Sequence, residues 1–362
     1  MVFIQLERVS KRLGATLAVD RAELEVHAGE LFFLLGPSGC GKTTLLNLIA
    51  GLLEPSEGRI LFDGRDVTRL PTHERNAVMC FQSYALWPHL SVAENVRFGL
   101  DVRRIERKQQ EERVREALEL VQMAEYRERK PAELSGGQQQ RVAIARAVAV
   151  KPSCLLLDEP LSNLDTRLRQ QMRGEIRSIC RATGLTTLYV THDQKEALSI
   201  ADRIALLEAG RIVQVGTPRE LYTRPSNTFV AEFLGQANLI PGTVLERRAR
   251  AAGTGEQLRV DTPLGQLSAF AEALPSDVSR VMLSIRPEQL ATVPVGQREA
   301  GGVNHVPVRL LESNFLGDSS EHRLTAGGLT LRMHSAPPRF DLPEELVLAL
   351  APEELVVLPA AG

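Results

Sequence analysis

The segment GPSGCGKT, residues 36–43, constrains the fold of this chain more than any other stretch of its sequence. It matches the pattern G-x-x-x-x-G-K-S/T, follows the apolar run Leu31–Leu35 and precedes the helical pattern Thr44–Gly51. Glycines in such a turn let backbone N–H groups surround phosphate oxygens, and the helix N-terminus adds positive potential. The residues predicted to bind the phosphates of a nucleotide are Gly36, Pro37, Ser38, Gly39, Cys40, Gly41, Lys42, Thr43 and Thr44.

Within this turn, Lys42 and Thr43 carry the most specific chemistry. A lysine at this position meets the β- and γ-phosphates, and the hydroxyl of the next residue is a ligand for Mg²⁺. The alternative is a chance glycine-rich turn, and the strand and helix patterns on either side argue against it.

The apolar run Cys154–Leu157 ends in two carboxylates, Asp158 and Glu159. An unbroken apolar run is typical of a strand buried on both faces, and ligands bind beyond the carboxyl ends of such strands in open α/β sheets. Asp158 is therefore a candidate for the Mg²⁺ shell, and Glu159 is a candidate base that orients or deprotonates the attacking water. The alternative is an ordinary solvated strand end.

Two more apolar runs end in polar side chains, at Gln82 and at His192. If the strands are parallel, Lys42, Gln82, Asp158 and His192 lie at one edge of the sheet. Gln82 can then offer its carbonyl to Mg²⁺, and His192 can hydrogen-bond the γ-phosphate and the catalytic water. Alone, such a glutamine is usually a solvated turn residue and such a histidine a structural one, but their coincidence favours a catalytic site.

The segment LSGGQ, residues 134–138, precedes another helical pattern. Ser135 and Gln138 have the S-x-x-Q spacing of a capping box, which alone predicts only a well-capped helix. Gly136 and Gly137 are not needed for a cap, and they expose backbone N–H groups that can bind an anion. Such a site cannot easily reach a phosphate that Lys42 of the same chain already holds, which favours a role in the site of a second chain.

Composition narrows the possible functions. The chain has 362 residues and a net charge of −2, and this near-balance argues against a general nucleic-acid binder. No apolar run approaches the roughly 18 residues that a membrane span needs, and the N-terminus lacks the order of a signal peptide. The four cysteines are scattered without a Cys-x-x-Cys pair, which favours buried free thiols over a zinc site or a disulfide framework.

The texture of the sequence changes near residue 235. Residues 1–235 alternate short apolar runs with helical patterns, which predicts a mainly parallel α/β sheet, with a helical subdomain at about 84–134. Within that subdomain, residues 108–130 have the pattern of one amphipathic helix. Residues 236–362 show short β-like runs punctuated by Gly, Pro and Ser, which predicts a small all-β domain or barrel. Examples of these runs are Val281–Ile285, Val306–Leu311 and Leu346–Leu350.

The motifs together resemble the nucleotide-binding subunit of an ATP-binding cassette (ABC) transporter. GPSGCGKT, Gln82, LSGGQ, LLLDEP, the SNLD segment (residues 162–165) and His192 follow that family's order and spacing over residues 1 to about 235. The resemblance implies a P-loop NTPase cassette with a helical subdomain that binds ATP and Mg²⁺. The metal ligands that it implies are Thr43, Gln82 and Asp158. The catalytic residues that it implies are Lys42, Gln82, Glu159 and His192.

The resemblance also implies partners. It implies a head-to-tail homodimer with two ATP molecules, each held between the P-loop of one chain and the LSGGQ residues of the other, Ser135, Gly136, Gly137 and Gln138. The SNLD segment then links the two sites across the interface. The segment near Tyr84–Pro88 resembles the groove that receives a helix from two integral membrane permease subunits, and core packing is the alternative for Trp87.

The segment SIRPE, residues 284–288, resembles the motif of the TOBE domain, an OB-like β barrel. That domain is appended to importer ATPases for sugars, polyamines, iron(III) and oxyanions, and it serves dimer contacts or regulation. The resemblance implies an importer ATPase, peripheral on the cytoplasmic face of the inner membrane, that serves an extracytoplasmic substrate-binding protein indirectly. The segments of this chain look most like those of polyamine and iron(III) importer ATPases, with sugar and phosphonate importers as alternatives.

One position departs from the family's pattern, and two rival classes fit less well. Where the family usually places an aromatic side chain on the adenine, just before Gly14, this chain has Leu13. A soluble ABC ATPase acting on ribosomes or DNA usually carries two cassettes or a long coiled-coil insertion. A plain P-loop kinase or GTPase would leave LSGGQ and His192 without a role.

Overall fold

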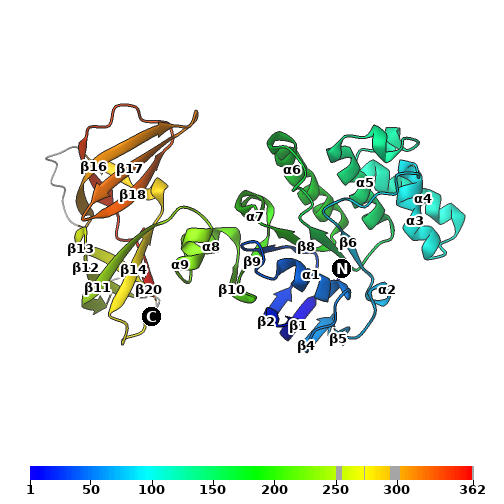
Figure 1. Ribbon diagram of the computed structural model, residues 1–362, viewed down its shortest axis with the longest axis horizontal. Coiled ribbons are helices and arrows are strands. Elements are labelled where there is room, and N and C mark those ends of the chain that lie inside the picture. The colour runs from blue at the N-terminus through cyan, green and yellow to red at the C-terminus, as the bar shows by residue number, and fades with distance from the viewer. Residues whose placement is uncertain (250–254, 273, 294–301, 361–362) are drawn as a thin grey trace. The chain divides into compact units, whose positions relative to one another are not determined.

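The computed structural model describes residues 1–362 except 250–254, 273, 294–301 and 361–362, and it divides into two compact units, Met1–Pro218 and Arg219–Gly362 (Figure 1). This division lies ahead of the boundary expected near residue 235. The reason is that helices α8 (Pro218–Thr223) and α9 (Thr228–Phe233) are tied to the second unit. There the buried Arg286 guanidinium donates to the carbonyls of Tyr222 and Ala231, at 2.8 and 2.7 Å.

The centre of the first unit is a six-stranded sheet in the order β10-β9-β3-β8-β7-β6. All neighbours in it are parallel except the edge strand β10, which confirms the predicted parallel sheet. Strands β3 and β8 are buried along their whole length, as expected for strands covered on both faces. The strands are β3 (Leu31–Leu35), β6 (Ala77–Cys80), β7 (Cys154–Asp158), β8 (Thr186–Thr191), β9 (Arg203–Glu208) and β10 (Arg211–Gly216).

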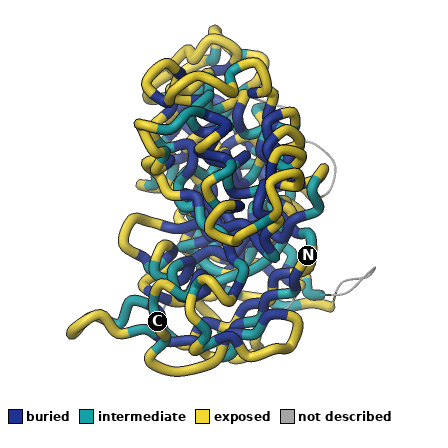
Figure 2. Tube along the Cα trace, turned by 90° about the vertical axis from the view of Figure 1, so that its right-hand side faces the viewer, coloured by how far each residue is buried: buried dark blue, intermediate teal, exposed yellow. Residues whose placement is uncertain are grey.

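A smaller antiparallel sheet has the order β2-β1-β4-β5. Its strands are β1 (Ile4–Leu13), β2 (Thr16–Val26), β4 (Glu57–Phe62) and β5 (Arg65–Asp66). Helix α1 (Lys42–Ala50) packs against strands of both sheets, and one hydrophobic core joins the helix to them. Buried segments form the interior and exposed segments the turns at the periphery (Figure 2). The core therefore fixes the position of the turn that precedes α1.

The helical insertion gathers α3 (Val92–Val102), α4 (Arg107–Leu120) and α5 (Gly136–Ala149) at one end of the first unit (Figure 1). The single helix expected over 108–130 was too long. It ends at Leu120 because Gln122 adopts a left-handed backbone with φ 57°, and two 3₁₀ turns follow at Ala124–Tyr126 and Pro131–Glu133. The other helices of this unit are α2 (Thr72–Arg75), α6 (Thr166–Thr183) and α7 (Gln194–Ile200). No helix among the described residues is long and apolar enough to cross a membrane.

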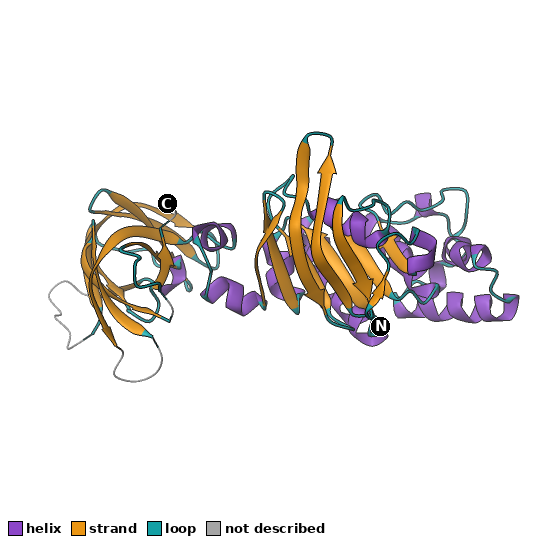
Figure 3. Ribbon diagram, turned by 90° about the horizontal axis from the view of Figure 1, so that it is seen from below, coloured by secondary structure: helices purple, strands orange, loops and turns teal. Residues whose placement is uncertain are grey.

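The second unit is built mainly of β-strands, as the sequence predicts (Figure 3). Five strands close a barrel in the order β11-β12-β13-β20-β14: β11 (Asn238–Ala249), β12 (Glu256–Thr262), β13 (Gly265–Ala271), β14 (Arg280–Ile285) and β20 (Val356–Pro359). Five more form a sheet in the order β15-β19-β16-β17-β18: β15 (Ala291–Val293), β16 (Asn304–Phe315), β17 (Ser320–Ala326), β18 (Leu329–Ser335) and β19 (Glu345–Leu350). A 3₁₀ turn, Pro287–Gln289, follows β14, and one apolar core fills the unit.

The barrel and the second sheet repeat one pattern of four strands. Strands β11 to β14 pair in the same order as β16 to β19, and RPEQL after β14 corresponds to APEEL after β19. The copies exchange their last strands, because β15 follows β14 but pairs with β19, and β20 follows β19 but pairs with β14. Asn238 and Asn304 begin the two copies, and each bonds the backbone of the other copy, at Arg332 and at Ser268. The unit is therefore a duplicated fold rather than one small barrel.

A histidine replaces an apolar residue in the core of the second copy. His322 is 0% exposed at the position of β17 that corresponds to Leu258 of β12. Its Nδ1 lies 2.8 Å from Ser313 Oγ and its Nε2 lies 2.9 Å from Ser320 Oγ, so the hydroxyls satisfy both nitrogens of a neutral ring. Burial, together with Arg339 and His334, lowers the pKa of His322.

We expect the second unit to lose stability as the pH falls below about 6.5, the ordinary pKa of histidine. The unfolded chain then binds a proton that folded His322 excludes, and the loss ends only when the folded side chain also protonates. Calorimetric unfolding of the full chain between about pH 8 and about pH 5 measures it. His322→Leu, which copies Leu258, should flatten the dependence, whereas His73→Leu, at an exposed histidine, should not. An unchanged pH slope in His322→Leu would contradict the assignment.

Candidate nucleotide-binding and hydrolysis site

The parallel register brings the predicted strand ends to one edge of the six-stranded sheet. The chain leaves β3 toward Lys42, β8 toward His192 and β6 toward Gln82, while β7 ends in Asp158 followed by Glu159. Parallel neighbours place their carboxyl ends at the same edge, which is where ligands bind in open α/β sheets. The structure therefore gathers the residues that the sequence singled out.

The glycine-rich turn is shaped by close backbone approaches. A Cβ atom at Gly36 would lie 2.3 Å from the carbonyl oxygen of Leu207, and one at Gly41 would lie 2.3 Å from that of Ala18. At Gly41 the backbone is also left-handed, with φ 103°. A Cβ atom at Gly39 would meet no other atom within 4 Å, so the turn is open on that side. Neighbouring strands thus require two of the glycines, independently of any phosphate.

Lys42 is buried at the start of α1 with its ammonium group folded over the turn. Its Nζ donates to the carbonyls of Gly36 and Pro37, each at 2.8 Å. Among the described residues, no carboxylate lies within ion-pair distance of Lys42. The positive charge is therefore held in place by backbone dipoles and is available to an anionic ligand.

Thr43 and Asp158 face each other across the edge. Thr43 Oγ1 donates to Asp158 Oδ1 at 3.1 Å. Burial raises the pKa of Asp158, the Thr43 hydrogen bond opposes that shift, and the Glu159 charge adds to it. A hydroxyl and a carboxylate side by side are the hard oxygen ligands that Mg²⁺ prefers, so this pair fits that ion.

Glu159 and His192 form the second contact of the edge. Glu159 Oε1 lies 3.2 Å from His192 Nδ1. The backbone of Glu159 is left-handed, with φ 44°. Two hydrogen bonds hold it: Glu159 N donates to the carbonyl of Val190 at 3.0 Å, and Ser162 Oγ donates to the carbonyl of Glu159 at 3.0 Å. A non-glycine residue kept in this strained conformation by its neighbours is a common feature of functional sites.

Gln82 lies at the same edge with an exposed side chain. Its backbone carbonyl accepts a hydrogen bond from Asn163 Nδ2 at 2.9 Å. Asn163 belongs to the SNLD segment, so the structure ties that segment directly to Gln82. Residue types and spacing alone gave no signal for this bond, because its partners are far apart in the chain.

The LSGGQ segment begins helix α5. Ser135 Oγ accepts from Gln138 N at 3.4 Å, and Ser135 N donates to Gln138 Oε1 at 2.9 Å, so the capping box is present. A Cβ atom at Gly137 would lie 3.0 Å from Leu168 on α6, and one at Gly136 would lie 3.2 Å from Leu164. Close helix packing is therefore a further reason for the glycines, which sequence reasoning missed. Ser135 and Gly136 are exposed and remain accessible to a partner, whereas Gly137, which was expected to be exposed as well, is buried where α5 packs on α6.

The loop after Gln82 presents an aromatic side chain to solvent. Trp87 is 42% exposed and packs on Phe98, with ring centroids 5.3 Å apart, so Trp87 is not part of the core. Buried Asn95 holds the loop, accepting from Trp87 N at 2.8 Å and donating to Trp87 O at 3.1 Å. Arg146 of α5 donates to the carbonyls of Ala85 (2.6 Å) and Tyr84 (2.8 Å). Asn95 and Arg146 are positioning residues that the sequence did not reveal.

Leu13 ends β1 and is 46% exposed. A Cβ atom at the adjacent Gly14 would meet no other atom within 4 Å, so the space beside Leu13 is open. This exposure leaves Leu13 accessible to a flat ligand.

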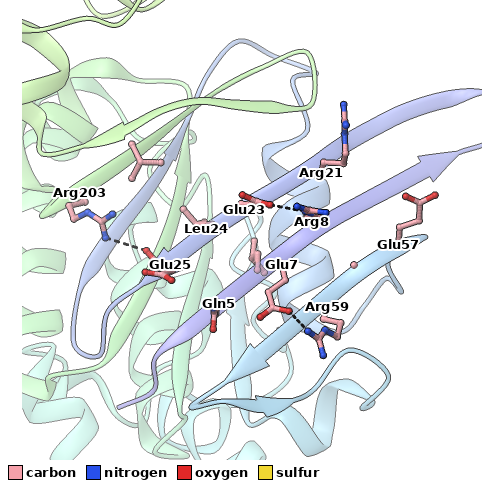
Figure 4. A pocket seen from close by; sticks show the side chains of 13 residues that line it. Gln5, Glu7, Arg8, Arg21, Glu23, Leu24, Glu25, Glu57, Arg59 and Arg203 are labelled. Carbon is pink, nitrogen blue, oxygen red and sulfur yellow. Dashed lines mark hydrogen bonds and ion pairs between the residues drawn. The ribbon is translucent and has the colours of Figure 1, made fainter. Parts of the chain in front are cut away.

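A hollow of about 980 Å³ lies away from this edge, on the outer face of the antiparallel sheet (Figure 4). Its charges are largely paired: Arg8 with Glu23 at 3.2 Å and Arg59 with Glu7 at 2.6 Å. Arg203 donates to the carbonyl of Glu25 at 3.2 Å. None of the predicted site residues lines this hollow, so we assign it no part in nucleotide binding.

Comparison with known proteins shows the family to which the chain belongs. The ABC transporter family matches residues 19–162. The chain is 45% identical over 350 residues to the Fe(3+) ions import ATP-binding protein FbpC of Rhizobium etli, covering 94% of each protein. It is 45% identical over 353 residues to the spermidine/putrescine import ATP-binding protein PotA 1 of Pseudomonas aeruginosa, covering 94% of this chain and 92% of the relative. It is 44% identical over 362 residues to the sulfate/thiosulfate import ATP-binding protein CysA 2 of Chromobacterium violaceum, covering 99% and 93%.

A solved structure is similar to part of the chain. It is the dimeric, post-hydrolysis state of an ATP-binding cassette bound to ADP and Pi, with a TM-score of 0.53 and 32% identity, covering 60% of this chain and 99% of that one. The chain belongs to the ATP-binding subunits of ABC importers. It is a transport-coupled ATPase.

Proposed function

We propose that the gathered strand ends are the hydrolytic site of this ATPase. The observation that carries the proposal is the pair of contacts at one sheet edge, Thr43 to Asp158 at 3.1 Å and Glu159 to His192 at 3.2 Å. Lys42 and the backbone N–H groups of the P-loop bind the β- and γ-phosphates. The other residues that bind the phosphates are Gly36, Pro37, Ser38, Gly39, Cys40, Gly41, Thr43 and Thr44.

Thr43, Asp158 and Gln82 would hold Mg²⁺. The oxygen atoms of Thr43 and Asp158 already face each other, and the side-chain amide of Gln82 is exposed at the same edge, where it can approach the ion. The ion, when bound, neutralises charge on the phosphates. A nearby cation also favours the carboxylate form of Asp158, whose pKa burial raises.

Glu159 acts as the base and His192 orients the reactants. The contact to His192 Nδ1 holds the Glu159 carboxylate, which orients the attacking water and accepts its proton. With Nδ1 turned to Glu159, the His192 ring can direct Nε2 at the γ-phosphate.

Each site is completed by a second copy of the chain. Ser135, Gly136, Gly137 and Gln138 would contact the γ-phosphate of the ATP held by the partner, which makes the γ-phosphate the signal for closure. The exposure of Ser135 and Gly136 at a capped helix N-terminus supports this role, as does the dimeric state of the similar solved cassette.

The groove at Tyr84–Pro88 receives the permease subunits. Trp87 and Phe98 expose apolar rings side by side, which fits a partner surface. The loop is anchored by Asn95 and Arg146, so a force on it reaches helices α3 and α5. The protein would therefore lie on the cytoplasmic face of the inner membrane, with an extracytoplasmic binding protein acting on the far side of the permease.

The transported substrate is a polyamine or iron(III). The relatives named for Fe(3+) import and for spermidine/putrescine import support these two at equal identity. The relative named for sulfate/thiosulfate import makes an oxyanion the second candidate. The β domain, residues 236–362 in the sequence-based division, would serve dimer contacts or regulation.

Affinity purification from native membranes in mild detergent tests this proposal. Two multi-span permease subunits and an extracytoplasmic binding protein are expected among the co-purifying chains. That binding protein is then titrated with putrescine, spermidine, ferric iron, sulfate, sugars and phosphonates. Recovery of ribosomal or soluble partners instead would overturn the transport assignment and leave the ATPase chemistry intact.

We expect Leu13→Tyr to tighten ATP binding. Base–aromatic stacking contributes about 1–3 kcal/mol relative to alanine in single-strand binders, and Leu13 already supplies part of this by apolar contact, so we expect Kd to fall by roughly two- to fivefold. Leu245→Tyr is the matched control, because Leu245 is an exposed leucine on β11 of the second unit, and it should leave Kd unchanged. Titration with a fluorescent ATP analogue measures both, and an unchanged or weaker affinity in Leu13→Tyr would sink the idea.

A further inference from the structure

A buried carboxylate packs against β8, the strand that His192 follows. Glu196 of α7 is 3% exposed. Its Oε2 accepts from Thr191 Oγ1 at 2.8 Å and from Tyr189 OH at 3.2 Å. Burial raises the pKa of Glu196, and the Thr191 hydrogen bond opposes that shift. A buried carboxyl group is retained at such a position only with partners that satisfy it.

The same bonds fix the backbone on both sides of His192. Thr191 donates its hydroxyl proton to Glu196, and its Oγ1 accepts from Asp193 N at 3.0 Å. Asp193 caps α7, accepting from Lys195 N at 2.8 Å and Glu196 N at 3.2 Å. His192 itself projects into solvent between these anchored neighbours. The backbone of His192 is therefore held by the bonds of Thr191, Asp193 and Glu196, while its ring contacts Glu159.

Helix α6 joins this network to the SNLD segment. Arg169 donates through Nη2 to the carbonyl of Leu164 at 3.1 Å and pairs through Nη1 with Asp193 Oδ2 at 3.4 Å. Its Nε lies 3.9 Å from Glu196 Oε1, close enough for an ion pair but without a hydrogen bond. Arg173, one turn along, donates to Asp193 Oδ2 at 3.0 Å. The guanidinium of Arg169 thus lies between Leu164 of the SNLD segment and the carboxylates of Asp193 and Glu196.

We propose that Glu196 and Arg169 are positioning residues for His192, coupling it to the SNLD segment. The inference rests on the proposed role of His192 in hydrolysis. A shift of Leu164 moves the guanidinium of Arg169, which carries Asp193 and the backbone of His192 with it. Because the SNLD segment lies at the proposed dimer interface, closure of the dimer sets the position of His192 against the γ-phosphate.

Glu196→Gln and Arg169→Lys test the link in the full-length protein. Glutamine can still accept from Thr191 but loses its charge toward Arg169, and lysine keeps its charge but cannot reach Leu164 and Asp193 at once. We expect kcat for ATP hydrolysis to fall about tenfold or more, because small misplacements of a catalytic group are costly. KM for ATP should stay within about twofold, since the P-loop is untouched.

Arg177→Lys is the matched control. Arg177 joins the same two helices farther along α6, donating to Ser199 O at 3.1 Å, away from His192. Its kcat and KM should stay within about twofold of the wild-type values. A drop in kcat equal to that of Arg169→Lys would show that any loosening of α6 against α7 suffices, and would overturn the specific link.

A double-mutant cycle with His192→Ala separates positioning from general stability. If Glu196 and Arg169 act through His192, their substitutions should cause no further loss of kcat in the His192→Ala background. Multiplicative losses would overturn the inference and leave the role of His192 intact. Normal turnover of His192→Ala alone would overturn the proposed function of His192 and the inference with it. If Glu196→Gln does not fold, the same double-mutant cycle is measured with Arg169→Lys, because the side chain of Arg169 is partly exposed.

Discussion

Replacement of Glu159 by glutamine is expected to lower the rate of ATP hydrolysis by about 10²–10⁴-fold while ATP binding is retained. Glutamine keeps the length of the side chain and can still contact His192 Nδ1, which lies 3.2 Å from the carboxylate. The amide cannot take a proton from the attacking water, so the loss falls on kcat. Phosphate release at saturating ATP measures the rate, and gel filtration with labelled ATP should show a persistent ATP-bound dimer.

Glu208→Gln is the matched control for this experiment. Glu208 is an exposed carboxylate that ends β9, the neighbour of β3 on the same edge of the sheet. Its substitution should leave kcat within about twofold, because it lies outside the proposed catalytic contacts. Normal turnover in Glu159→Gln would mean that another group takes the proton, and the assignment of Glu159 would be wrong.

Lys42→Ala is expected to weaken ATP binding by more than about tenfold, because a charge-assisted hydrogen bond contributes about 1.5–3 kcal/mol. The Lys42 ammonium is held by the carbonyls of Gly36 and Pro37 and forms no ion pair with a carboxylate of the described residues, so its removal takes away a positive charge that can bind the phosphates. The measurement is the Kd of a fluorescent ATP analogue, with thermal unfolding followed in parallel.

Lys108→Ala controls for the general loss of a lysine. Lys108 is exposed on α4, far along the chain from the P-loop, and its removal should change neither Kd nor unfolding temperature. Unaltered ATP affinity in Lys42→Ala would show that the backbone N–H groups of the turn bind the phosphates without the side chain. A large fall in unfolding temperature alone would identify Lys42 as a structural residue.

The candidate site was largely predictable because its residues lie in short segments that can be recognised locally. The P-loop occupies eight consecutive residues, 36–43, and Gln82, the Asp158–Glu159 pair and His192 each follow an apolar run. Parallel strands then bring such residues together by a general rule of open sheets. The sequence therefore predicted, from four separate places in the chain, which strand ends lie at one edge of the sheet.

The support behind the site was not predictable, since it consists of bonds between residues remote in sequence. Asn163 bonds the carbonyl of Gln82, and Arg146 bonds those of Tyr84 and Ala85. No spacing rule pairs such residues. The glycines of LSGGQ show the same limit: a role for their backbone amides could be argued locally, but the lack of space for a Cβ atom between Gly137 and Leu168 depends on how α5 packs on α6.

The second unit marks the limit most clearly. Its β-like runs were visible, and Val281–Ile285, Val306–Leu311 and Leu346–Leu350 lie in β14, β16 and β19. The duplication was not expected, because the copies share few residues, such as RPEQL and APEEL. The exchange of β15 and β20 follows no local pattern, because it depends on which remote strand completes each hydrogen-bonded edge.

By itself, the sequence determined the glycine-rich turn before α1, the apolar strands and their polar ends, and the all-β character of the second part. These depend on residue chemistry, backbone freedom and periodicity within about ten residues. Only the tertiary structure decided the strand order, the division at Pro218, the strained backbone of Glu159 and the network from Leu164 to His192. Those features arise from contacts between segments remote in sequence, and their geometry exists only once the core has formed.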